Sequence, residues 1–197
     1  MDKPLKILVV DDIAQIRALF REGIQATFSN VEITEAENLR EARHALQNAS
    51  FDAIITDCGF PNETEVVRES GNRNGVVLIN EIRQRKYGKT NALAPIAFNS
   101  AEITPAKESG ALQPGGNTKC FKKGSLYGSL TRGTATNNFT VGSVATPTMS
   151  WLQTELTEEK VSERRKSLED AARGNEGVSF LSRFFGVGSK SNRASGK

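Results

Sequence analysis

The 197-residue sequence predicts an α/β fold in which helices cover both faces of a doubly wound, five-stranded parallel sheet. Short apolar segments alternate with segments whose apolar residues recur at helical spacing, which is typical of such sheets. The first apolar segment ends in Asp11 and Asp12, and the third ends in Asp57. Because parallel sheets bind ligands beyond the carboxyl ends of their strands, we expect these carboxylates to share one edge.

The predicted elements follow one another in regular alternation. Short, mostly apolar or alternating segments predict strands at residues 6–10, 31–36, 51–57, 95–98 and 119–122. Apolar residues at helical spacing predict helices at residues 13–29, 39–46 and 75–87. Asp11 or Asp12 is a candidate to cap the first helix. A fourth helix has room for about two turns near residues 105–112, because prolines and glycines surround it.

The composition changes beyond Lys123. Residues 125–149 are rich in glycine, serine, threonine and asparagine, and we expect a loop or linker there. A capping-box pattern at Ser150 predicts a charged helix over residues 150–173. Residues 174–197 are expected to form a mostly disordered basic tail. The sheet should therefore be followed by an irregular C-terminal extension.

The overall composition excludes several classes of protein. A net charge of +3 is too small to indicate nucleic-acid binding, and no apolar stretch is long enough to span a membrane. The N-terminus shows no signal-peptide pattern. The two cysteines, Cys58 and Cys120, are expected in the core, and a single histidine excludes a histidine-rich metal site within this chain. We therefore expect a cytoplasmic location.

The three aspartates at the strand ends indicate a metal site. Three carboxylates brought to one edge would repel one another unless a cation joined them. Carboxylate oxygens are the ligands that Mg²⁺ prefers, and a neighbouring acidic side chain can accept a phosphoryl group. Asp11, Asp12 and Asp57 are thus candidate Mg²⁺ ligands.

The ordered set Asp11–Asp12, Asp57, Ser100 and Lys123 resembles the receiver domain of two-component response regulators, over about residues 4–124. The segment from Asp57 to Pro61 is similar to the phosphoacceptor loop of that family. The resemblance implies a flavodoxin-like (CheY-like) sheet with strand order 2-1-3-4-5 and a receiver domain at residues 1–124. Residues 62–74 would then be an insertion at the rim of the active site.

The resemblance also implies a role for each site residue. Asp57 would be the phosphoacceptor, taking phosphate from a sensor histidine kinase or a phosphotransfer protein. Ser100 and Lys123 would each contact a phosphoryl oxygen. The Mg²⁺ ligands would be Asp11, Asp12, Asp57 and the backbone carbonyl of Gly59.

Several alternatives remain open at this level. The aspartate pair could only cap a helix, Ser100 could be an ordinary turn residue, and Lys122 could replace Lys123, although strand alternation favours Lys123. The family often has a proline after the lysine and a switch aromatic three residues before it. Here these positions hold Gly124 and Cys120, so we expect a trans peptide and a different output mechanism.

The leading functional hypothesis is a stand-alone phosphoaccepting receiver that signals through protein–protein contacts to an unknown output protein. It would not be a conventional enzyme, and no DNA-binding domain is evident in the remaining sequence. The alternative is a degenerate receiver that acts as a phosphorylation-independent interaction module; the insertion, the broken fourth helix and Cys120 favour it. A phosphatase of the haloacid-dehalogenase type is disfavoured, because Gly59 stands where that class usually has a second aspartate.

Overall fold

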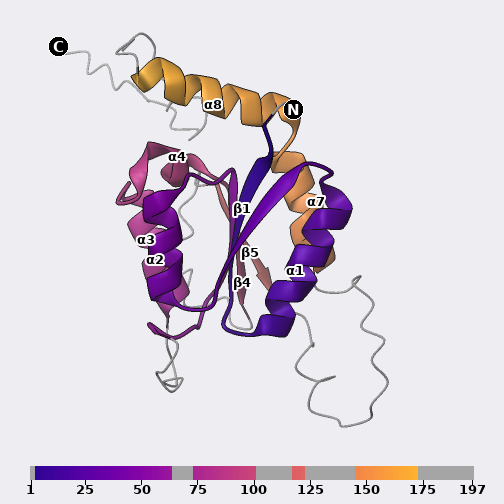
Figure 1. Cartoon of the computed structure of the whole chain (residues 1–197), viewed down its shortest axis with the longest axis vertical. Coiled ribbons are helices and arrows are strands. Elements are labelled where there is room, and N and C mark those ends of the chain that lie inside the picture. The colour runs from indigo at the N-terminus through magenta and orange to yellow at the C-terminus, as the bar shows by residue number, and fades with distance from the viewer. Residues whose placement is uncertain (1–2, 64–72, 101–116, 123–144, 173–197) are drawn as a thin grey trace, which may run out of the picture.

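The computed structural model describes residues 3–63, 73–100, 117–122 and 145–172. They form a five-stranded sheet with the order β2-β1-β3-β4-β5, in which every neighbouring pair is parallel (Figure 1). The predicted fold class and the strand order 2-1-3-4-5 are confirmed. The predicted helix at 105–112, Lys123, the basic tail and most of the insertion at 62–74 lie outside the described residues.

All five predicted strands are present, with small shifts at their ends. Their bounds are β1 Leu5–Val10, β2 Val31–Ala36, β3 Ala53–Asp57, β4 Ile96–Ser100 and β5 Thr118–Lys122. β4 continues two residues further than predicted because Asn99 and Ser100 still pair in register with β5. The register places Asp57 opposite Asn99 on the neighbouring strand.

The described helices lie in two layers around the sheet. Their bounds are α1 Ala14–Thr27, α2 Leu39–Asn48, α3 Asn74–Arg83, α4 Gly88–Leu93, α7 Ala145–Glu155 and α8 Glu158–Ala172. α1 and α7 cover one face of the sheet, and α2 and α3 cover the other (Figure 1). β1 is buried on both faces: Leu8 packs towards α2 and α3, whereas Ile7 packs towards α1 and α7.

The helix predicted at 75–87 ends earlier in the structure, and a second, short helix begins only beyond it, at Gly88. α3 ends at Arg83, and Arg85 has a positive φ of 64°, which a continuous α-helix does not allow. The guanidinium of Arg83 donates hydrogen bonds to the carbonyls of Ala92, Ala94 and Asn117. The short helix α4 follows, and Arg83 thereby ties α3 to the starts of β4 and β5.

The predictions for the C-terminal region need two corrections. α7 begins at Ala145, so residues 145–149 belong to a helix and not to the predicted linker, and Ser150 lies inside α7. The single helix predicted at 150–173 is interrupted after Glu155, and the Thr157 hydroxyl accepts the Lys160 N–H at 3.4 Å at the start of α8. The reason is burial: Met149 and Leu152 pack into the α1 face of the core, and this outweighs a local capping signal.

α8 lies across the end of the sheet where the strands begin (Figure 1). The guanidinium of Arg165 donates to the carboxylate of Asp52 at 2.7 Å and to the Pro4 carbonyl at 3.0 Å. Val161 joins the core cluster of α1 and α7. The opposite end of the sheet, where the strands finish, is therefore not covered by α8.

Two further sequence predictions can be compared with the described residues. Cys58 and Cys120 both pack with the α2–α3 core cluster, as expected. Cys120 and Phe121 face opposite sides of the sheet, which confirms the predicted alternation in β5. Within the part of the chain described, no helix has the length and hydropathy that a membrane span requires.

Candidate metal centre

Three carboxylates meet where β1 and β3 end. Asp11 and Asp12 follow β1, Asp57 is the last residue of β3, and these two strands are neighbours in the sheet. One oxygen from each carboxylate lies within 4.8 Å of the other two. Asp11 is 1% exposed and Asp57 is 7% exposed, whereas Asp12 is partly exposed, so two of the three carboxylates are buried. We call Asp11, Asp12 and Asp57 the acidic cluster; its assembly follows the prediction from sequence.

The acidic cluster suits a hard divalent cation. At an effective dielectric constant of about 20, two unit negative charges at this separation repel by about 3 kcal/mol. Burial strengthens the repulsion because it removes water that would screen the charges. Mg²⁺ is bound in proteins by one or a few carboxylates together with water and phosphate oxygens. Asp11, Asp12 and Asp57 therefore fit Mg²⁺ by their chemistry and their spacing.

The position of Asp11 is fixed by the turn between β1 and α1. Its Oδ1 accepts the N–H of Ile13 at 3.0 Å, and its carbonyl accepts a hydrogen bond from Arg17 at 2.7 Å. α1 begins only at Ala14, and the N-cap residue is Ile13, which makes no side-chain cap. The N-cap position is therefore held by Ile13 and by neither Asp11 nor Asp12.

The loop from Asp57 to Pro61, the Asp57 loop, is braced against α3. The Cys58 N–H donates to Asp57 Oδ1 at 2.7 Å, which orients the carboxylate. The Cys58 carbonyl accepts the Gly75 N–H at 2.9 Å, and the Phe60 carbonyl accepts the Asn74 side-chain amide at 2.8 Å. The Phe60 ring is fully buried in the core. Gly59, the predicted backbone ligand, thus lies between two carbonyls held by α3.

Gly75 is a functional position that the sequence prediction treated only as the start of a helix. A Cβ atom at this position would lie 1.8 Å from the carbonyl oxygen of Asp57, well inside van der Waals contact. Only glycine lets α3 approach the backbone of the phosphoacceptor candidate so closely. The available signal was a glycine in the first turn of the helix that follows the Asp57 strand.

Ser100 is the last residue of β4 and is 2% exposed, so it is a strand residue and not an ordinary turn residue. It lies on the strand beside β3, one residue beyond the register partner of Asp57. Lys123 and the side chain of Lys122 lie outside the described residues, and the choice between them stays a prediction.

A second buried polar contact lies beside the acidic cluster and had no signal in the sequence pattern. The Thr148 hydroxyl of α7 donates to the Asn99 side-chain oxygen at 2.9 Å, and both residues are almost fully buried.

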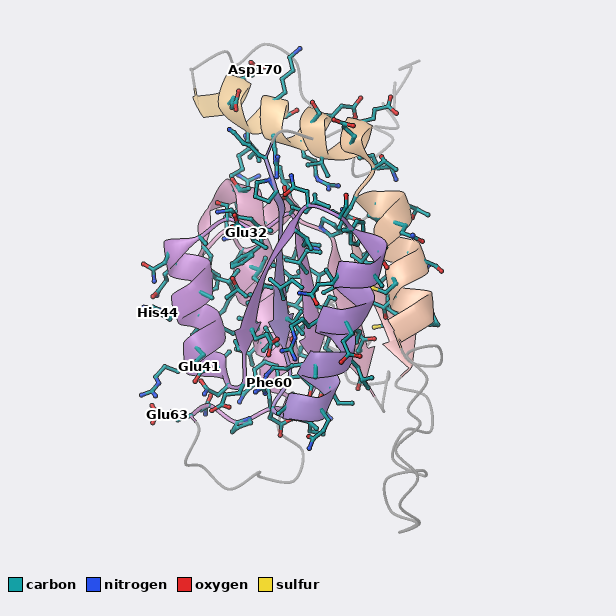
Figure 2. All side chains as sticks on the ribbon, turned by 45° about the vertical axis from the view of Figure 1, so that its right-hand side comes forward. Glu32, Glu41, His44, Phe60, Glu63 and Asp170 are labelled. Carbon is teal, nitrogen blue, oxygen red and sulfur yellow. The ribbon has the colours of Figure 1, made fainter. Side chains whose placement is uncertain are left out.

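Figure 2 shows Phe60 of the Asp57 loop at the end of the molecule opposite Asp170 of α8. The candidate site and the α8 end are thus separated by the length of the sheet.

Comparison with known proteins finds a family model and solved structures that are similar to this chain. The family model of the response regulator receiver domain matches residues 7–127. A CheY-like receiver domain from Methanospirillum hungatei is 11% identical, with a TM-score of 0.51, over 84% of this chain and 99% of that one. The chemotaxis response regulator CheY4 of Vibrio cholerae is 26% identical, with a TM-score of 0.46, over 66% of this chain and 98% of that one.

A third solved structure is the response regulator TrrA of Thermotoga maritima, described as a complex with Mg²⁺ and BeF. It is 26% identical, with a TM-score of 0.44, over 64% of this chain and 92% of that one. The overall likeness to the Methanospirillum structure supports the shared fold.

Proposed function

Because the chain belongs to the family of response regulator receiver domains of two-component systems, we propose that it accepts a phosphoryl group on Asp57. The donor would be the phosphohistidine of a sensor histidine kinase or of a phosphotransfer protein. The observation that carries the proposal is the acidic cluster, whose three carboxylates lie within 4.8 Å of one another.

The proposed reaction is a transfer between two side chains. A carboxylate oxygen of Asp57 attacks phosphorus, the bond between phosphorus and the donor imidazole breaks, and an acyl phosphate forms on Asp57. The electron pair of the broken bond stays on the imidazole nitrogen, which takes up a proton. The hydrogen bond from Cys58 N–H to Asp57 Oδ1 supports this role because it fixes one oxygen and thereby orients the other.

A bound Mg²⁺ would neutralise the negative charge that gathers on the phosphoryl oxygens. The residues proposed to hold it are Asp11, Asp12, Asp57 and the backbone carbonyl of Gly59. Ser100 and Lys123 are proposed to contact the remaining phosphoryl oxygens. The position of Ser100 supports its assignment, because it follows the register partner of Asp57 on the neighbouring strand and is buried.

The chain would act by changing the surface it presents to a protein partner. Its chemistry would be limited to its own phosphorylation and the slow hydrolysis of the acyl phosphate, so we do not propose a conventional enzyme. A cytoplasmic location belongs to the same proposal, since two-component phosphotransfer takes place there.

The test is intact-mass spectrometry after incubation with acetyl phosphate and Mg²⁺. The wild type is expected to gain one phosphoryl group, and Asp57→Asn is expected to gain none. Asp170→Asn is the matched control, because it makes the same change at the opposite end of the molecule (Figure 2) and should react as the wild type does. A wild type that gains no mass would contradict the proposal and favour a phosphorylation-independent interaction module.

A further inference from the structure

A buried polar contact joins α7 to the sheet next to the acidic cluster. The Thr148 hydroxyl donates to Asn99 Oδ1 at 2.9 Å; Thr148 is 0% exposed and Asn99 is 1% exposed. The other hydrogen bond of the Asn99 side chain, from Nδ2 to the Ala97 carbonyl, is long at 3.5 Å. Thr148 is therefore the closer of these two partners.

Asn99 is the neighbour of the phosphoacceptor candidate across the sheet. It pairs in parallel register with Asp57. Paired residues of parallel strands point to the same face and are about 4.8 Å apart between strands. The flanking residues agree, since Ile55 and Ala97 belong to the same core cluster under α1 and α7. Asn99 thus lies between Asp57 and Thr148, and Ser100 is the next residue along its chain.

The surroundings of this polar pair are apolar. Met149 and Leu152 of α7 pack into the same cluster as Ala97. Apolar side chains tolerate small shifts of one element against another, whereas a buried hydrogen bond is lost when either partner moves. The contact between Thr148 and Asn99 therefore fixes α7 to the end of β4.

We infer that Thr148 and Asn99 link the acidic cluster to α7, so that a phosphoryl group on Asp57 changes how α7 packs on the sheet. Phosphorylation adds negative charge beside the Asn99 side chain and draws the Ser100 hydroxyl towards the new oxygens. Any movement of this end of β4 reaches Thr148 through the hydrogen bond. Thr148 is thus a positioning residue that acts through Asn99. The inference rests on the proposed function, because it needs an occupied site at Asp57.

The fluorescence of Trp151 can report on the link between the acidic cluster and α7. Trp151 is the single tryptophan of the sequence and lies in α7, one turn from Thr148. Its ring contacts the ring of Phe121 in β5, with 5.7 Å between the centroids. A shift of α7 against the sheet should alter this contact and therefore the fluorescence of Trp151.

The experiment uses the full chain with Mg²⁺ and beryllium fluoride, which imitates a phosphoryl group on a carboxylate. Binding is followed by ¹⁹F NMR of the bound fluoride, and the packing of α7 by Trp151 fluorescence. The variants are Thr148→Val, which removes the hydroxyl at constant shape, and Thr148→Ser, which keeps it. Thr154→Val is the matched control, because Thr154 is an exposed threonine of the same helix.

The expected result separates binding from its effect on α7. Wild type, Thr148→Ser and Thr154→Val should bind beryllium fluoride and change their fluorescence, whereas Thr148→Val should bind with a response at least about fivefold smaller. The inference is overturned if Thr148→Val responds as the wild type does, or if the wild type binds without any fluorescence change. A wild type that gives no ¹⁹F signal of bound fluoride would contradict the proposed function itself.

Discussion

The carboxylate of Asp57 is positioned by backbone contacts as much as by side chains. The Cys58 N–H holds one of its oxygens at 2.7 Å, and the first turn of α3 packs directly on its carbonyl. This packing depends on the missing side chain of Gly75. Because Gly75 has no Cβ atom, α3 can pack against the backbone of Asp57 and so position the candidate nucleophile.

The first prediction concerns this close approach. Gly75→Ala should displace the Asp57 backbone, because the atoms that a Cβ would meet are backbone atoms that cannot rotate away. We expect a loss of about 1–3 kcal/mol in the free energy of unfolding, as for other overpacked sites. Phosphorylation by acetyl phosphate should slow by about 10–100-fold, because small misplacements of reacting groups are costly.

Gly88→Ala is the control for this prediction. Gly88 has a φ of +86° and no atoms within 4 Å of a Cβ, so alanine there brings backbone strain without a clash. We expect it to lose about 1 kcal/mol of stability and to keep its phosphorylation rate. Equal phosphorylation rates in the two variants, measured by intact mass over time, would show that Gly75 does not position Asp57.

At the scale of the elements, α2 and α3 are held together by a charged cluster around Glu81. Arg43 of α2 donates two hydrogen bonds to this carboxylate, at 3.0 and 2.8 Å. Lys86 and Tyr87 also donate to it. Burial raises the pKa of Glu81, but these hydrogen bonds outweigh it and lower the pKa to about 2. Burial, together with the hydrogen bond to Glu81, raises the pKa of Tyr87 to about 12.

The second prediction follows from the lowered pKa of Glu81. A carboxyl group with a depressed pKa in the folded state stabilises the fold above its ordinary value of 4.5, and this contribution is lost as the pH falls towards 2. Glu81→Gln should therefore cost about 1–3 kcal/mol at neutral pH, and less as the pH falls below 4.5. Urea unfolding between pH 7 and pH 3 measures the difference from the wild type.

Glu32→Gln gives the comparison for the Glu81 cluster. The ion pair of Glu32 with Lys6 is 3.4 Å long, and both side chains are about half exposed, at 59% and 47%. Such surface pairs contribute about 0–1 kcal/mol, so we expect almost no change at any pH. A Glu81→Gln effect that does not shrink in acid would show that the titration of Glu81 is not its source.

At the scale of the whole molecule, α7 completes the domain from a distant part of the sequence. β5 ends at Lys122 and α7 begins only at Ala145, yet α7 packs beside α1 on the same face of the sheet (Figure 1). Leu152 is 0% exposed in this layer. α7 therefore belongs to the core of the receiver fold. α8 follows it in the chain and lies across the end of the sheet where the strands begin (Figure 1).

The third prediction tests whether α7 is part of the cooperative core. Leu152→Ala should lower the free energy of unfolding by about 2–5 kcal/mol, because it leaves a cavity between α1 and α7. Val77→Ala, at a side chain that is 42% exposed, is the control and should change it by less than about 0.5 kcal/mol.

Urea unfolding of the wild type, followed by two spectroscopic probes, gives a second measurement for this prediction. Trp151 fluorescence reports α7, whereas far-UV circular dichroism reports all the helices and strands. The two urea transitions should coincide if α7 and the sheet unfold together. A separate, earlier Trp151 transition, or a Leu152→Ala variant as stable as the wild type, would show that α7 is only loosely attached.

The amino-acid sequence alone was enough to predict the parallel sheet, the order of its elements and the meeting of Asp11, Asp12 and Asp57. These features follow from patterns within short segments: apolar runs that end in aspartate, and right-handed crossovers that bring all carboxyl ends to one edge. The resemblance to receiver domains added the strand order, which the structure has as β2-β1-β3-β4-β5.

The packing of the whole molecule was needed to find where α7 begins, why Gly75 must be glycine and how Thr148 meets Asn99. The capping pattern at Ser150 is a local signal, but burial of Met149 and Leu152 against α1 extends the helix back to Ala145. Each of these features is a contact between residues far apart in the chain. The pattern of a short segment does not predict such contacts, because the free energy that stabilises them arises only when distant surfaces pack together.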